Sequence, residues 1–179
     1  MDPFFQPEYL SGFFLLIAFL WIPRIFYLLA SLIHEMGHAF LAKIVGAENI
    51  EVQVGYGGKL LLKLSLNLLK FKLFNAKDCH GTTSYKLEDT KKKALILVTL
   101  GGPLFSLCFS MLTIYLLHSF YENLGFGFQI GLIIVFITNA KFFILSAIPK
   151  VYPANKNFPC GWKTDGQIIH ELLKKKNDH

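Results

Sequence analysis

Five consecutive residues, His34-Glu35-Met36-Gly37-His38, carry the side chains of this sequence that are best suited to chemistry. On a helix, positions four apart lie on one face, so both imidazoles can reach a single metal ion. The glutamate beside the first histidine can hold and deprotonate a water on that metal. Zn²⁺ in such a site polarises a carbonyl and makes hydroxide available near neutral pH. The pattern predicts His34 and His38 as zinc ligands and Glu35 as the catalytic base.

The sequence around this motif is unusually apolar. Of 179 residues, 53% are hydrophobic and only 17% are charged, which is more apolar material than a small soluble core can bury. Lipid must therefore solvate much of the chain. An ionisable residue inside a membrane helix costs roughly 2.5 to 3.5 kcal/mol and is usually there for function. A merely structural His-Glu-His cluster is the weaker interpretation.

The apolar segments predict a mainly α membrane protein with about three transmembrane helices in a single domain, residues 1–179. We place the spans at about 23–46, 94–118 and 128–149. Residues 9–22 form an apolar lead-in before Pro23, and either extend the first helix, kink at the proline or lie in the membrane interface. The tail, 150–179, carries turn-forming residues and a short amphipathic stretch.

Between the first and second spans the pattern changes to alternation of apolar and polar residues. Residues 49–86 form this β-rich segment, and glycines near residue 57 supply a turn. We expect a small antiparallel β-sheet on the cytoplasmic side. An exposed strand edge along residues 52–56, with Val54 and Tyr56, is expected to bind the substrate by strand addition, because proteases commonly read an extended backbone.

Lysines give the expected orientation. Ten lie between Lys43 and Lys93, six from Lys150 to the end, and none in residues 119–127. Since cytoplasmic loops carry the excess of positive charge, the N-terminus is expected outside and the C-terminus in the cytoplasm, in a bacterial plasma membrane. The lysines adjoin apolar runs rather than lining a polar fold, so the expected partner is the lipid bilayer and not nucleic acid.

The polar and helix-breaking residues of the three spans lie at one depth. Counted at about 1.5 Å per residue from the inner helix ends, His38, Gly102 and Lys141 all lie roughly 12 to 14 Å deep. Asn139 lies about half a turn deeper. Lys141 either steadies a substrate carbonyl or reaches the cytoplasmic surface. Gly101 and Gly102 either let helices approach closely or relieve crowding beside Pro103.

The ordered set of motifs resembles the site-2 protease family of intramembrane zinc metalloproteases. The matching residues are His34 to His38 followed by Ala39, the strand segment Val54-Gly55-Tyr56-Gly57, the pair Gly102-Pro103, and then Asn139, Pro149 and Asp165-Gly166. These cover nearly the whole chain in the family's order. The set is much more specific than an HExxH motif alone, which many metalloproteases share.

The resemblance implies that Asp165 is the third zinc ligand and that Asn139 lies near the substrate backbone. It further implies zinc-dependent endopeptidase activity on a membrane-inserted peptide or a single-span protein, with an accessory membrane protein left open. Two features depart from the family pattern: Ser106 replaces a frequent asparagine, and fifteen residues separate Pro149 from Asp165. His170 is the competing ligand, because imidazole also suits zinc.

Two other functions remain open. One is a prenyl-peptide-type membrane metalloprotease, which typically takes a glutamate as its third ligand, although no downstream glutamate has the expected spacing. The other is a non-catalytic membrane protein that binds a peptide or confers immunity on the same fold. Replacing Glu35 separates a binder from a protease.

Overall fold

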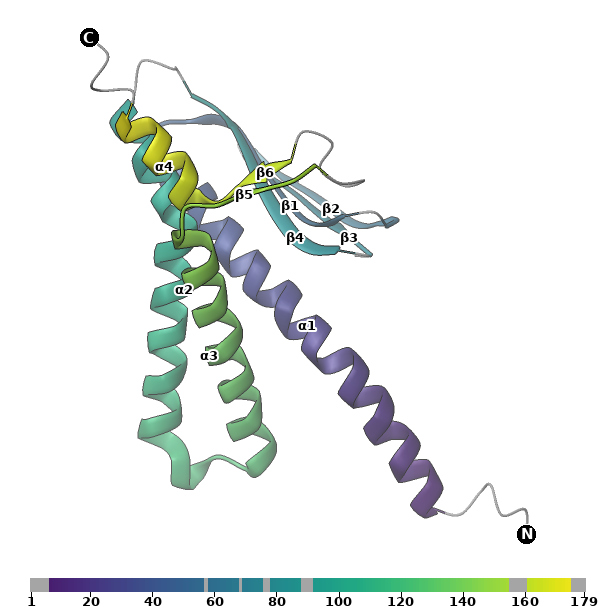
Figure 1. The fold of residues 1–179 in the computed structure, drawn as a ribbon. Coiled ribbons are helices and arrows are strands. Elements are labelled where there is room, and N and C mark those ends of the chain that lie inside the picture. Colours follow the sequence, from purple (N-terminus) through teal and green to yellow (C-terminus); the bar gives the residue numbers. More distant parts are fainter. Residues whose placement is uncertain are drawn as a thin grey trace.

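The computed structural model describes residues 7–56, 58–67, 69–75, 78–87, 92–154 and 161–174. In this part of the chain, three long helices carry a small sheet near one end (Figure 1). The long helices are α1 (Pro7–Ile44), α2 (Lys92–Phe120) and α3 (Phe126–Ala147), and the 3₁₀ turn η2 (Tyr121–Asn123) leads from α2 to α3. A short helix, α4 (Asp165–Lys174), lies at the same end as the sheet.

Three helical segments are long and apolar enough to cross a membrane. Within the described residues they are Arg24–Ile44, Lys92–Asn123 and Phe126–Ala147. The predicted spans are thus confirmed as candidate membrane helices. In α3 only Asn139 is buried, and an apolar helix exposed on most sides needs lipid around it. The chain is therefore a mainly helical integral membrane protein.

Helix α1 continues through Pro23 without a break. It runs from Pro7 to Ile44, so the lead-in at residues 9–22 extends the first helix. Its 38 residues span about 57 Å, well beyond the roughly 30 Å of a bilayer's hydrocarbon core. Its N-terminal part leads away from the neighbouring pair α2 and α3 (Figure 1).

Helices α1 and α2 cross at two glycines. A Cβ atom placed on Gly37 would collide with the backbone carbonyl of Gly101, and one on Gly101 with that of Gly37. Only glycine allows two helix backbones to approach so closely. Small buried residues continue the contact along α2, among them Ser106 and Ser110. Gly101 is therefore a helix-packing glycine, one of the two roles left open above.

The four strands of the main sheet are β1 (Glu48–Tyr56), β2 (Leu60–Leu66), β3 (Leu69–Phe74) and β4 (Asp78–Lys86), in the order β2-β3-β1-β4. β1 pairs antiparallel with β4 but parallel with β3, with Val52 opposite Phe71. β2 pairs antiparallel with β3. The sheet is mixed, and the predicted all-antiparallel sheet is wrong.

Burial explains this strand order. Ile50, Val52 and Val54 are fully buried in the core beneath α1, which requires an interior position for β1. β3 packs its own apolar row on the same core, whereas every residue of β2 is exposed. β3 therefore lies between β1 and β2. β2 separates β1 from β3 along the chain and runs antiparallel to both, so β1 and β3 run parallel. The glycine turn reversed the chain as expected but did not make β1 and β2 neighbours.

The interior position of β1 overturns a second expectation. Both edges of residues 52–54 pair with neighbouring strands, so the predicted free edge along 52–56 is wrong. The outer strands of this sheet are β2 and β4.

A second, two-stranded sheet follows α3 and leads to α4. It consists of β5 (Val151–Tyr152) and β6 (Trp162–Lys163), paired antiparallel with Tyr152 opposite Trp162. α4 begins at Asp165, two residues after β6. The pairing of β5 with β6 therefore brings the chain back and delivers Asp165 to the end of α3.

Candidate metal centre and active site

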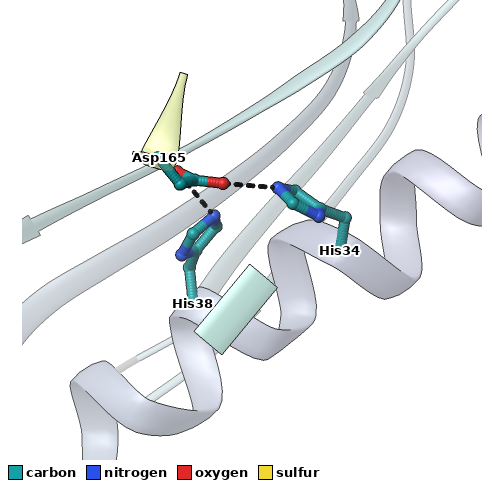
Figure 2. Close-up of side chains that lie close together, drawn as sticks. All are labelled: His34, His38 and Asp165. Atoms are coloured by element: carbon teal, nitrogen blue, oxygen red, sulfur yellow. Dashed lines mark hydrogen bonds and ion pairs between the residues drawn. The ribbon is translucent and has the colours of Figure 1, made fainter. Parts of the chain in front are cut away.

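The three predicted zinc ligands meet at one point (Figure 2). His34 and His38 project from one face of α1, and Asp165 faces them from the start of α4. Asp165 Oδ2 lies 3.1 Å from His34 Nε2, and Asp165 Oδ1 lies 3.4 Å from His38 Nε2. One ligand atom from each residue lies within 4.8 Å of the other two, which suits a shared metal ion. His170 lies exposed on α4 and is not part of this group.

Helix α2 orients both imidazoles through their Nδ1 atoms. His38 Nδ1 lies 2.8 Å from the carbonyl oxygen of Val98. The backbone nitrogen of Gly102 is farther from His38 Nδ1, at 3.3 Å. Since a carbonyl only accepts, Nδ1 carries the hydrogen and the Nε2 lone pair is free for a metal. His34 Nδ1 lies 3.0 Å from Ser106 Oγ. Ser106, a departure from the family pattern, can therefore orient the ring of a predicted zinc ligand.

Gly102 leaves the space that the imidazoles occupy. A Cβ on this residue would collide with His38 Nε2 and would lie 2.6 Å from His34 Nε2. Both atoms are the ones that face Asp165. Any larger residue at position 102 would push the ligands apart, so the second of the two glycines serves the metal centre.

Two neighbours of Asp165 fix its position. Thr164 Oγ1 donates to the carbonyl of Ile148 at 2.7 Å and accepts from the amide of Gln167 at 3.3 Å. It therefore caps α4 and ties it to the end of α3. A Cβ on Gly166 would collide with the carbonyl oxygen of Ala147. Glycine at this position therefore allows the close contact between α4 and the end of α3.

The predicted base, Glu35, is held from the sheet side. Thr83 on β4 donates its hydroxyl hydrogen to Glu35 Oε2 at 2.7 Å, with the backbone carbonyl of Glu35 at 3.0 Å. A Cβ on Gly81, two residues earlier on β4, would collide with the Glu35 side chain. Sequence reasoning missed both residues, because which strand faces α1 is a property of tertiary packing. Glu35 itself is only 7% exposed.

Charges near the site act on two groups outside the membrane helices. Burial alone would raise the pKa of Asp165, but hydrogen bonds from His34 and His38 and their positive charge, present when no metal is bound and the Nε2 atoms are protonated, lower it to about 2. The carboxylate is thus ionised, which is the form that binds metals. Burial and then the negative charge of Asp165 raise the pKa of Tyr85, which keeps its phenol neutral.

A cavity of about 550 Å³ opens beside the three ligands. Residues 80–83 and Tyr85 of β4 form one wall, and the β5–β6 hairpin forms another. The volume lies within the usual range for ligand pockets. The cavity places Glu35, the ligands and the outer strand β4 around one common space.

Two of the predicted substrate-binding residues, Val54 and Asn139, do not line this cavity. Val54 is buried in β1, and for Tyr56 the structure describes only the backbone. Asn139 is 1% exposed, and its Nδ2 donates to the Val135 carbonyl at 2.9 Å. Its Oδ1 is buried without a hydrogen-bond partner among the described residues. The roles of these three residues in substrate binding stay predictions.

Lys141, whose role was left open, lies exposed on α3. Its Nζ sits 5.6 Å from the centre of the Tyr27 ring on α1, in a cation–π contact. Tyr27 also lines the cavity. The contact links α1 and α3 at the cavity's edge and leaves both proposed roles of Lys141 open.

Helical spans that enclose a His-Glu-His helix and a returning aspartate define a membrane metalloprotease fold. Residues 24–175 match the model of peptidase family M50, the site-2 protease family. The match covers most of the chain. The chain belongs to this family of metalloproteases, and the resemblance stated above is confirmed. Among curated proteins, none matches the chain.

We expect Asp165→Ala to lose zinc. Removing an outer-shell partner already weakens metal binding by about 10- to 100-fold, so removing a ligand should cost at least as much. His170→Ala is the matched control on the same helix and should keep about one zinc per chain. Metal analysis of the detergent-purified variants checks this. Zinc kept in Asp165→Ala but lost in His170→Ala would reverse the assignment.

We expect Thr83→Val to lower kcat about 10- to 100-fold, since one hydrogen bond to a charged group contributes about 1.5 to 3 kcal/mol. Valine keeps the shape of threonine but cannot donate to Glu35. KM and zinc content should change little, and Thr83→Ser should restore most of the rate. Cleavage of fluorescently labelled casein is the measurement. A Thr83→Val variant with the kcat of the unmodified protein would show that Glu35 is oriented by other contacts.

Proposed function

We propose that this chain is a zinc-dependent intramembrane endopeptidase. The observation that carries the proposal is the convergence of His34, His38 and Asp165 beside a buried Glu35, on helices apolar enough to lie in a bilayer. The donor set of two imidazoles and one carboxylate suits a catalytic zinc, which takes three protein ligands and keeps a fourth position open. Membership of peptidase family M50 supports the same function.

The residues of the site would have separate roles in the reaction. Zinc, when bound, would supply the Lewis acid that polarises the scissile carbonyl and activates water. Glu35 would take the proton from the attacking water and pass it to the leaving amine. Thr83 holds the Glu35 carboxylate in place, so little orientation remains to be gained during the reaction.

An extended substrate is best placed along β4. This strand is an outer strand of the sheet, and its residues Gly81 and Thr83 line the cavity and contact Glu35. A membrane-inserted peptide or single-span protein must unwind locally before its backbone can be cut, and an outer strand can pair with the unwound segment. β4 thus replaces the residues 52–56 of β1 as the proposed capture strand.

We infer that the metal centre lies toward the cytoplasmic side of the membrane. The ends of α2 and α3 joined by η2 carry exposed aromatics, including Tyr121, Phe126 and Phe128, as expected at a membrane interface. The described lysines of the sheet and of α4, among them Lys63 and Lys174, belong to elements at the opposite end (Figure 1). The bacterial plasma membrane stays a prediction.

We expect an accessibility tag inserted beside Leu124 to report the outside, and a tag at the C-terminus to report the cytoplasm. The reason is the absence of lysine between residues 119 and 127 against six from Lys150 onward. Labelling of intact cells and of inverted vesicles distinguishes the two sides. A Leu124 tag facing the cytoplasm would reverse the proposed orientation.

We expect Glu35→Gln to abolish cleavage of labelled casein by the purified protein, by at least about 100-fold, since a positioned acid–base group typically contributes 10²- to 10⁴-fold. Zinc content should be retained, because Glu35 is not among the three converging ligands. Glu122→Gln, on exposed η2 at the far end of the helices, is the matched control and should leave the rate unchanged.

If the purified protein cleaves neither casein nor membrane-inserted peptides, the endopeptidase proposal is wrong. If cells that carry the Glu35→Gln variant have the same phenotype as cells with the unmodified protein, the function as a non-catalytic peptide-binding or immunity protein is favoured instead.

A further inference from the structure

The hairpin between α3 and α4 carries an aromatic pair beside the metal centre. The Tyr152 and Trp162 rings stack with their centres 4.4 Å apart and their planes inclined by 7°. They face each other across the paired strands β5 and β6. The fifteen residues that separate Pro149 from Asp165 exceed the compact family pattern, so this pair belongs to the segment in which the chain departs from it.

The aromatic pair is fixed at both ends. Lys150 Nζ lies 4.7 Å from the centre of the Tyr152 ring, and the His80 ring on β4 lies 5.4 Å from that of Trp162. The hairpin is thus connected to the proposed capture strand through side chains. A wall built in this way is pre-organised, because its rings lose little freedom when a ligand binds.

The pair lines the same cavity as the three candidate ligands. Trp162 precedes the ligand Asp165 by three residues, and Thr164 between them ties the segment to the end of α3. Tyr152 and Trp162 both line the cavity that holds the three ligands and Glu35. Phe142 and Leu145 of α3 and Ile168 of α4 also line it.

Two described lysines next to the pair, Lys150 and Lys163, already have partners. Lys163 Nζ forms an ion pair with Glu171 at 2.7 Å, and Lys150 lies over the Tyr152 ring. An acidic substrate side chain would have to compete with these contacts. An apolar side chain gains from burial against aromatic and aliphatic walls without that competition.

We propose that Tyr152 and Trp162 form a specificity subsite that accepts a large apolar side chain of the substrate residue next to the scissile bond. This inference rests on the proposed endopeptidase function. It assigns to the β5–β6 hairpin the selection of the cleavage position, a task separate from its delivery of Asp165.

The test compares cleavage positions in a mixture of peptides of randomised sequence, incubated with the detergent-purified full chain and analysed by mass spectrometry. The unmodified protein should cut preferentially beside one large apolar residue. In Trp162→Ala that preference should fall about tenfold or more, the discrimination that a lost apolar contact gives. Cuts beside small residues and a zinc content of one per chain should persist. Trp162→Phe should keep most of the preference.

Two further variants make the outcome decisive. Val151→Ala changes an exposed residue of the same hairpin that does not line the cavity, and should leave the profile unchanged. Tyr152 is farther along the chain from Asp165 than Trp162 is. Tyr152→Leu should change the residue preference of cleavage at the same substrate position as Trp162→Ala. The subsite is disproved if Tyr152→Leu and Trp162→Ala both cut with the profile of the unmodified protein. It is also disproved if Trp162→Ala loses zinc while Tyr152→Leu keeps the unmodified profile. If the unmodified protein cuts nothing, the endopeptidase proposal fails instead.

Discussion

The backbones of α1 and α2 meet at Gly37 and Gly101, and the metal centre depends on this contact. The crossing lies inside the HExxH motif, between Glu35 and His38, so it sets where both imidazoles lie against α2. At this distance the Val98 carbonyl and the Ser106 hydroxyl reach the Nδ1 atoms, and Gly102 leaves room for the Nε2 atoms. A wider crossing would remove these contacts together, since both helices are rigid.

Two further elements complete the site from opposite directions. β4 brings Thr83 and Gly81 against Glu35, and α4 brings Asp165 against the histidines. A glycine makes room for each contact, since a Cβ on Gly81 would collide with the Glu35 side chain and one on Gly166 with the Ala147 carbonyl. The predicted base is therefore oriented by the sheet and the predicted third ligand by the end of α3. The sheet and a long helix thus each position one part of the candidate site.

The sequence was sufficient for the parts that depend on local spacing. The four-residue separation of His34 and His38 predicts their shared face, and apolar length predicts the three spans. Asp165 followed from the resemblance, but the hairpin that delivers it did not. The parallel pairing of β1 with β3 and the contact of Thr83 with Glu35 escaped prediction, because both depend on which strand faces the core. α1 continued through Pro23 because helices in an apolar setting tolerate proline.

Whether His34, His38 and Asp165 hold one zinc ion can be measured by X-ray absorption at the zinc edge of the purified full chain. We expect one zinc per chain with two imidazole nitrogens and oxygen ligands at about 2.0 to 2.2 Å. A sulfur shell at about 2.3 Å would require a cysteine ligand and would rule out this set of ligands. A protein that takes up no zinc when the metal is in excess would rule it out as well.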